Sequence, residues 1–163
     1  MYSYLHIGME WELITALLLM SMFMIILVTD MSYMLIPNKV LLFFLPLFII
    51  MRMIRPLDPW WDALIGAALG FGLLAVVILL SKGGMGGGDL KLFAVLGLIL
   101  GPWELLLSFF LSCLFGALIG MGLLLSKTIK RGQPIAFGPY IVAGTIITYF
   151  HGETIIQWYL GFL

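Results

Sequence analysis

The chain has 163 residues, of which 63% are hydrophobic and 10% are charged, and its formal net charge is zero. About 25% of the residues of a soluble globular domain are charged, so this composition excludes an ordinary soluble domain and predicts a membrane protein. The balanced charge gives no indication of nucleic-acid binding, and the length predicts one domain over residues 1–163.

The N-terminal stretch MYSYLHIGMEWE is acidic rather than basic, so we do not expect it to be a cleavable signal peptide. The single cysteine, Cys113, lies within an apolar run. An intrachain disulfide or a zinc cluster of cysteines is therefore excluded.

Six apolar stretches predict an all-α, polytopic membrane protein with about six transmembrane helices. They cover residues 13–29, 40–54, 62–80, 90–100, 105–126 and 135–150. The fourth is too short to cross about 30 Å of hydrocarbon. Either it is a re-entrant or buried helix, or the glycine-rich stretch before it already lies below the membrane surface, inside the protein. The apolar tail, residues 152–163, is expected to lie at the interface.

Lysine and arginine predict the orientation of the helices. The loops after the first, third and fifth stretches are rich in basic residues, whereas the opposite loops hold only Arg52 and Arg55. The positive-inside rule places the basic set in the cytoplasm and both termini outside. The basic set is Lys39, Lys82, Lys91, Lys127, Lys130 and Arg131.

The acidic residues are distributed unevenly between the two predicted sides of the membrane. Only Asp30 and Asp89 fall on the predicted cytoplasmic side, one at the end of the first stretch and one at the start of the fourth. They are either two solvated loop acids or a pair held at similar depth, and ionisable groups at membrane depth are candidates for function. The opposite side holds Glu10, Glu12, Asp58, Asp62, Glu104 and Glu153.

A carboxylate pair has a defined chemistry. Two carboxyl groups a few ångströms apart do not both ionise readily, so one keeps a proton and the other loses it. The ionised group can take a proton from water while the protonated group donates to a peptide carbonyl oxygen, which is what peptide hydrolysis requires. The neighbouring glycines, Gly83, Gly84 and Gly86–Gly88, would let a substrate approach the backbone and would permit positive φ, although a flexible loop is the alternative.

Three segments of the sequence resemble the type IV prepilin leader peptidases, a family of GxGD-type intramembrane aspartyl peptidases. TDMSYMLIPNKV contains Asp30 and Ile36-Pro37-Asn38, and GGGDLKLFAVLGLILG contains Gly86-Gly87-Gly88-Asp89-Leu90-Lys91. PIAFGPYIVAG, residues 134–144, is similar to the Pro-Phe-Gly-Pro stretch of the family, with Ala136 inserted. The three segments stand in the family's order and frame residues 30–144.

The resemblance implies that Asp30 and Asp89 are the catalytic pair, with no cofactor or metal. It implies supporting or substrate-binding roles for Gly86, Gly87, Gly88, Lys91, Pro37 and Asn38. For Lys91, electrostatic support of the pair and simple interfacial exposure remain alternatives. The implied partners are the lipid bilayer and a prepilin or pseudopilin precursor of a type IV pilus or secretion system, cut on the cytoplasmic face of the cell membrane. The oligomeric state stays open.

Many bacterial members carry an N-terminal extension with Cys-x-x-Cys motifs and methyltransferase activity. This sequence has neither the length nor the cysteines for such an extension, so we expect it to be the short, peptidase-only form. Presenilin relatives share GxGD, but their first aspartate follows a tyrosine, whereas Asp30 follows Thr29. A small proton-coupled transporter using both aspartates as a relay is the main alternative, although no second copy of the glycine loop supports internal repeats. A purely structural subunit would leave the two acids unexplained.

Overall fold

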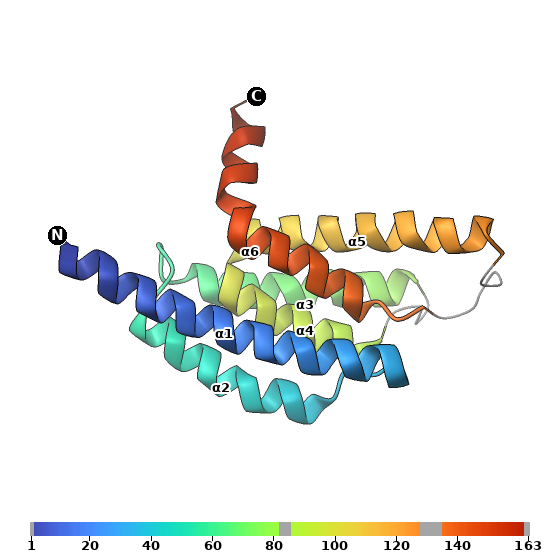
Figure 1. Cartoon of the computed structure of the whole chain (residues 1–163), viewed down its shortest axis with the longest axis horizontal. Helices are drawn as coiled ribbons and strands as arrows, with labels where there is room; N and C mark the ends of the chain where they lie inside the picture. Colours follow the sequence, from blue (N-terminus) through green and yellow to red (C-terminus); the bar gives the residue numbers. More distant parts are fainter. Residues whose placement is uncertain (1, 82–85, 128–134, 162–163) are drawn as a thin grey trace.

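The computed structural model describes residues 2–81, 86–127 and 135–161. Within these residues the chain forms six α-helices, which run in alternating directions as an up-and-down bundle (Figure 1). Lys82, Gly83, Gly84, Lys130, Arg131 and Pro134, which were considered above, lie outside the described residues. The helices are α1 (Tyr2–Tyr33), α2 (Asn38–Ile54), α3 (Asp62–Leu80), α4 (Gly87–Leu100), α5 (Pro102–Leu125) and α6 (Gly138–Leu160).

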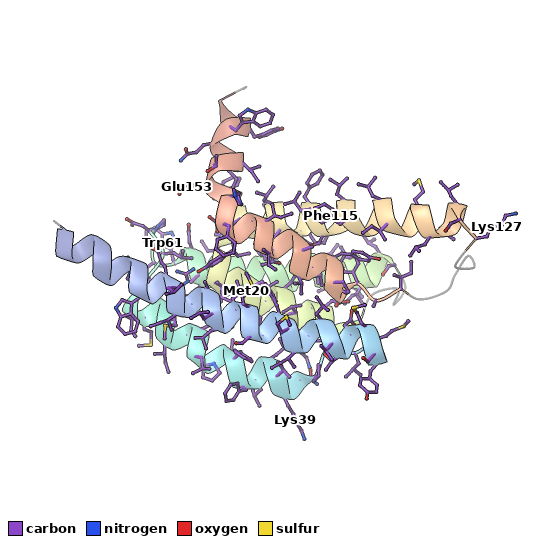
Figure 2. The ribbon with its side chains drawn as sticks, viewed as in Figure 1. Met20, Lys39, Trp61, Phe115, Lys127 and Glu153 are labelled. Carbon is purple, nitrogen blue, oxygen red and sulfur yellow. The ribbon has the colours of Figure 1, made fainter. Side chains whose placement is uncertain are left out.

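The predicted all-α membrane fold is confirmed. By length and composition, three described helical segments are able to cross a membrane: Trp11–Tyr33, Asp62–Leu80 and Pro102–Leu125. The third predicted stretch coincides with α3, and the sixth overlaps α6 but begins and ends earlier than the helix does. Helix α6 begins at Gly138 and continues into the tail to Leu160, and its C-terminal part turns away from the bundle near Glu153 (Figures 1 and 2).

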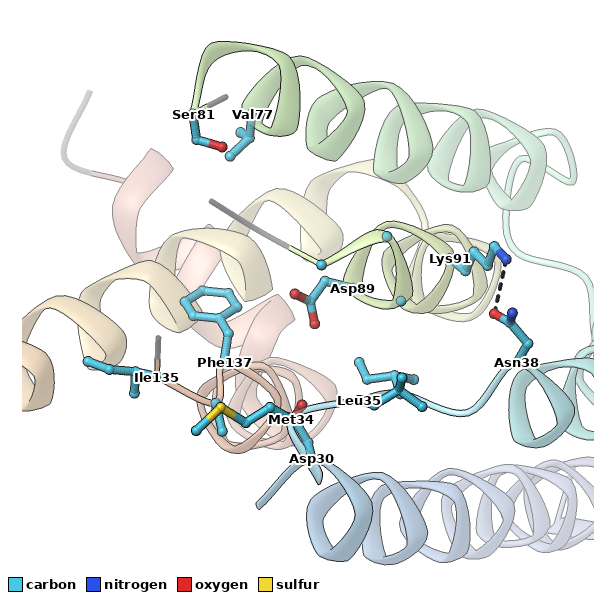
Figure 3. A pocket seen from close by; sticks show the side chains of 15 residues that line it. Asp30, Met34, Leu35, Asn38, Val77, Ser81, Asp89, Lys91, Ile135 and Phe137 are labelled. Atoms are coloured by element: carbon cyan, nitrogen blue, oxygen red, sulfur yellow. Dashed lines mark hydrogen bonds between the residues drawn. The ribbon is translucent and has the colours of Figure 1, made fainter. Parts of the chain in front are cut away.

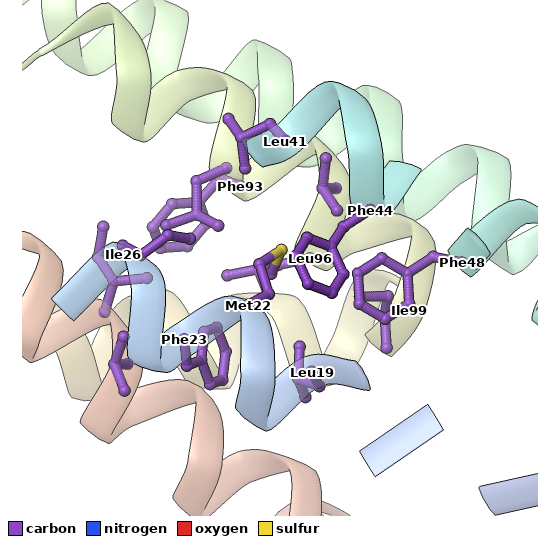
Figure 4. Packing of buried hydrophobic residues seen from close by; sticks show 14 of the residues in the cluster. Leu19, Met22, Phe23, Ile26, Leu41, Phe44, Phe48, Phe93, Leu96 and Ile99 are labelled. Carbon is purple, nitrogen blue, oxygen red and sulfur yellow. The ribbon is translucent and has the colours of Figure 1, made fainter. Parts of the chain in front are cut away.

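Helix α4 is short and lies at the centre of the bundle. It has 14 residues, which corresponds to about 21 Å, and eight of them are buried. Phe93, Leu96 and Ile99 face Met22 of α1 and Phe44 of α2 in the apolar core (Figure 4). Because the neighbouring helices cover α4, it can be short without exposing its ends to lipid.

Helices α3 and α4 pack with their backbones in contact. A Cβ atom added at Gly66 or at Gly97 would overlap the backbone of the other residue, and one added at Gly70 would overlap the carbonyl group of Phe93. Lipid is as apolar as the helix surfaces, so helices in a membrane associate through close packing and hydrogen bonds rather than through the hydrophobic effect. The glycines therefore fix α4 against α3.

Helices α5 and α6 meet through small and polar residues. The hydroxyl groups of Ser108 and Thr145 are hydrogen bonded at 2.8 Å, and both side chains are buried. Gly144 lies so close to Ser112 that an added Cβ would be 2.6 Å from the Ser112 Oγ. These contacts fix the middle of the first half of α6 against α5.

At the end of α4 away from Asp89, charged groups join several helices. The Arg52 guanidinium of α2 donates a hydrogen bond to the backbone carbonyl of Ile99, in the last turn of α4. A cation at a helix C-terminus satisfies free carbonyl groups and interacts favourably with the helix dipole. Nearby, the Arg55 Nη2 lies 3.7 Å from the Glu12 Oε1. The first of these contacts holds the end of α4 away from Asp89 against α2.

Candidate active site

Asp30 and Asp89 line one cavity, although 59 positions separate them in the chain. The cavity has a volume of about 720 Å³ and lies where α1 ends and α4 begins (Figure 3). Asp30 is in the last turn of α1 and is 5% exposed, and Asp89 is in the first turn of α4 and is 7% exposed. The two carboxyl groups are near enough to interact electrostatically. The structure thus brings the two predicted acids together.

The position of Asp30 depends on α6. Its Oδ2 accepts a hydrogen bond of 2.7 Å from the backbone N–H of Gly138, the first residue of that helix. Phe137, the preceding residue, lines the cavity. The third sequence segment therefore joins the site, and Gly138 is a site residue that was missing from the predicted set. Gly138 lies in the segment that is similar to the Pro-Phe-Gly-Pro stretch of the family, and that similarity could have identified it.

The position of Asp89 follows from the start of α4. Gly86 precedes the helix with an extended backbone, φ −74° and ψ 143°, and its carbonyl accepts the N–H of Asp89 at 3.1 Å. An acidic residue in the first turn is favoured by the helix dipole. Figure 3 shows the Asp89 side chain reaching from α4 toward the side of the cavity formed by Asp30 and Phe137.

The three described glycines before Asp89 differ in their surroundings. None of the three takes a positive φ, so the expectation that they serve a turn with positive φ is wrong for them. Among the described glycines only Gly101, at the α4–α5 corner, has a positive φ. A Cβ at Gly88 would lie 2.9 Å from the Ile36 Cβ, whereas one at Gly87 would meet nothing within 4 Å. Gly88 is therefore required by packing, and Gly86 and Gly87 leave space at the cavity.

We expect Gly88→Ala to destabilise the protein by about 1–3 kcal/mol, because the new methyl group overpacks the contact with Ile36. Gly87→Ala is the matched control, with an expected change within about 0.5 kcal/mol. The measurement is the free energy of unfolding in detergent micelles. Equal effects of the two substitutions would contradict the assigned packing role of Gly88.

Lys91 and Asn38 form a bridge between α4 and α2. The Lys91 Nζ donates a hydrogen bond of 3.0 Å to the Asn38 Oδ1, and both residues are exposed and line the cavity. Figure 3 shows Lys91 directed away from Asp89. Pro37, the remaining member of the predicted set, is not among the cavity residues; it precedes α2 with φ −70°.

The rest of the cavity wall is mostly apolar. Met34 follows α1 with a left-handed backbone, φ 51°. The chain after it brings Ile36 into contact with Gly88. None of these wall residues was predicted as a site residue, although all but Val77 and Ser81 lie in the two segments TDMSYMLIPNKV and PIAFGPYIVAG that resemble the family. The wall consists of Met34, Leu35, Ile36, Val77, Ser81, Ile135, Ala136 and Phe137.

Among the described residues, no group of three or more His, Cys, Asp or Glu side chains could hold a metal ion. The site offers two carboxyl groups, one side-chain amide, one lysine and one hydroxyl group, and the backbone N–H at the start of α6 is bonded to Asp30. This set of groups can carry out acid–base chemistry on a neutral substrate group such as an amide.

Comparison with known proteins is consistent with this chemistry. The sequence model described as the type IV leader peptidase family matches residues 17–121. A prepilin leader peptidase/N-methyltransferase of Bacillus subtilis (strain 168) is 46% identical over 96% of this chain. Proteins of the same name from Aeromonas salmonicida and Pseudomonas aeruginosa are 36% and 35% identical, over 93% and 96% of the chain.

The chain spans 63%, 54% and 56% of the length of these three relatives, respectively. No solved structure gives a significant match.

Proposed function

The chain belongs to the type IV leader peptidase family, and from this premise we propose that it is a membrane aspartyl endopeptidase with Asp30 and Asp89 as its catalytic pair. The observation that carries the proposal is the meeting of these two buried carboxyl groups in one cavity. Few arrangements other than acid–base catalysis explain two adjacent acids that lie largely out of water.

In the proposed reaction, the ionised member of the pair removes a proton from a water molecule bound between the two carboxyl groups. The water oxygen attacks the peptide carbonyl carbon while the protonated member donates its proton to the carbonyl oxygen. The tetrahedral intermediate then collapses: the C–N bond breaks, the leaving nitrogen takes a proton from the first carboxyl group, and one hydroxyl of the intermediate returns its proton to the second. The pair returns to one shared proton, so the cycle needs no metal.

The proposed substrate is a prepilin-like precursor, which has a short leader followed by an apolar helix. A cavity of about 720 Å³ is within the usual range of ligand sites, about 300–1,000 Å³, and its apolar wall suits the start of the apolar helix. Gly86 and Gly87 leave room at the exposed edge for an extended backbone to approach.

We propose that the cavity faces the cytoplasm of a cell with a type IV pilus or secretion system, and that both termini lie outside. Lys39 and Lys127 lie toward the end of the bundle where α1 ends, and Trp61 lies toward the other end (Figure 2). The excess of Lys and Arg in the loops at the cavity end supports this orientation.

Co-expression with candidate precursors from the same organism tests the function, with loss of the leader scored as a shift on a gel. The same assay with purified protein and EDTA separates an aspartyl from a metal-dependent peptidase, because we expect the chelator to have no effect. Proton uptake into proteoliposomes without precursor cleavage would instead favour a transporter, in which the two aspartates relay protons.

The bridge between Lys91 and Asn38 gives a second test of the site. We expect Lys91→Met and Asn38→Ala each to reduce cleavage less than about tenfold, since an exposed hydrogen bond contributes about 0.5–1.5 kcal/mol. The double variant should cleave as slowly as either single one, because both changes remove the same bond. If Lys91→Met alone abolishes cleavage, the lysine acts on the carboxylates directly.

A further inference from the structure

The first turn of α6 starts without a cap of its own. Phe137, the residue before the helix, makes no side-chain capping hydrogen bond. The first N–H groups of a helix have no partner within it. Here the N–H of Gly138 is satisfied by the Oδ2 of Asp30, a side chain from α1, at 2.7 Å.

We propose that Gly138 is a positioning residue that fixes the carboxyl group of Asp30 for catalysis. This inference rests on the proposed function. A hydrogen bond to Oδ2 selects one orientation of the Asp30 side chain and leaves Oδ1 to contact the attacking water. Helix α6 thus acts on the reaction through one backbone group at its start.

The fit between Gly138 and Asp30 leaves no room for a side chain. A Cβ at position 138 would lie 2.5 Å from the Oδ2, 2.9 Å from the Cγ and 3.0 Å from the Cβ of Asp30. Asp30 is only 5% exposed, and the space open to its carboxyl group is the cavity that it lines. Any larger residue would therefore rotate the carboxyl group away from the N–H.

Aromatic packing holds the start of α6 in place. The ring of Phe137 packs edge-on against Tyr140, with centroids 6.0 Å apart. It also lies against α5 at Gly116, where an added Cβ would be 2.9 Å from the Phe137 Cε2. The N–H of Gly138 is therefore presented by a rigid element, as an orienting group must be.

The test compares Gly138→Ala with Gly144→Ala. Both glycines are on α6 and both are in close contact, but Gly144 contacts Ser112 of α5, away from the cavity. We expect Gly138→Ala to lower kcat by about 100-fold with little change in KM, because displacing a catalytic group by about 1 Å slows a reaction by about that factor. Gly144→Ala should lower Tm but, per folded molecule, keep kcat within about threefold.

A third variant covers the case in which Gly138→Ala does not fold. Gly116→Ala pushes on the edge of the Phe137 ring, so it should move the start of α6 slightly and lower kcat by about threefold to tenfold. An unchanged kcat in folded Gly138→Ala overturns the inference. If Gly138→Ala does not fold, an unchanged kcat in Gly116→Ala overturns it.

A measurement without substrate separates this inference from the proposed function. In protein labelled with ¹³C at the aspartate carboxyl carbons, the infrared difference between the unchanged protein and Asp30→Asn identifies the Asp30 band. We expect Gly138→Ala to shift that band and Gly144→Ala to leave it in place. If Gly138→Ala shifts the band but Asp30→Asn still cleaves at the normal rate, the proposed function is refuted and the contact between Gly138 and Asp30 stands. If Gly138→Ala leaves the band in place, the role of Gly138 is refuted.

Discussion

Replacing Asp30 or Asp89 with asparagine is expected to lower precursor cleavage by more than about 1,000-fold, with the protein still folded in the membrane. An amide cannot accept the proton of water, and it cannot alternate between the two protonation states that the reaction uses. Losing a member of a catalytic unit commonly costs about 10⁴-fold or more. The two side chains are similar in size, so the cavity should keep its shape.

The measurement is the rate of cleavage at matched amounts of folded enzyme, judged by Tm in detergent. Asp58→Asn is the control, because Asp58 is exposed, lies between α2 and α3, and does not line the cavity. Its rate should stay within about twofold. Normal cleavage by either Asp30→Asn or Asp89→Asn would rule out the aspartyl mechanism.

The second large effect is expected at Gly97, which is buried in the contact between α4 and α3 and does not line the cavity. Gly97→Ala should destabilise the protein by about 3 kcal/mol, because its methyl group would overlap the backbone of Gly66 and neither backbone can move independently. Separating α3 from α4 would also displace Asp89, which α4 carries in its first turn. Cleavage should therefore fall together with the free energy of unfolding.

Gly72→Ala is the matched control on α3. A Cβ at Gly72 would meet nothing within 4 Å, so the substitution should stabilise the helix by up to about 1 kcal/mol. The two variants are thus expected to differ in sign. Reversible unfolding in mixed micelles measures both, and a neutral Gly97→Ala would show that α3 and α4 do not need their close contact.

The sequence predicts most of the helices because apolar length is a local property. Asp62–Leu80 was located to the residue, since charged and turn residues bound it on both sides. The start of α6 was misplaced, because Ile135 and Ala136 are apolar but lie outside the helix and line the cavity. Composition does not distinguish an apolar residue in a helix from one in a cavity wall.

The sequence by itself determined the candidate acids. Asp30 and Asp89 stand out because charged residues are costly at membrane depth, and that cost is a property of each residue rather than of the fold. The supporting residues Gly86, Gly87, Gly88, Lys91 and Asn38 followed from two segments that resemble a known family, and all five line the cavity, whereas Pro37 does not.

Only the tertiary structure decided how these residues are used. Gly88 is needed for contact with Ile36, Lys91 is bonded to Asn38, and Gly138 donates to Asp30 from 108 positions further along the chain. Each of these contacts involves α4 or α6, and α4 packs against α3 at Gly66 and Gly97 while α6 packs against α5 at Gly144. Backbone contacts of this kind depend on two helices at once, so the pattern of one segment does not specify them.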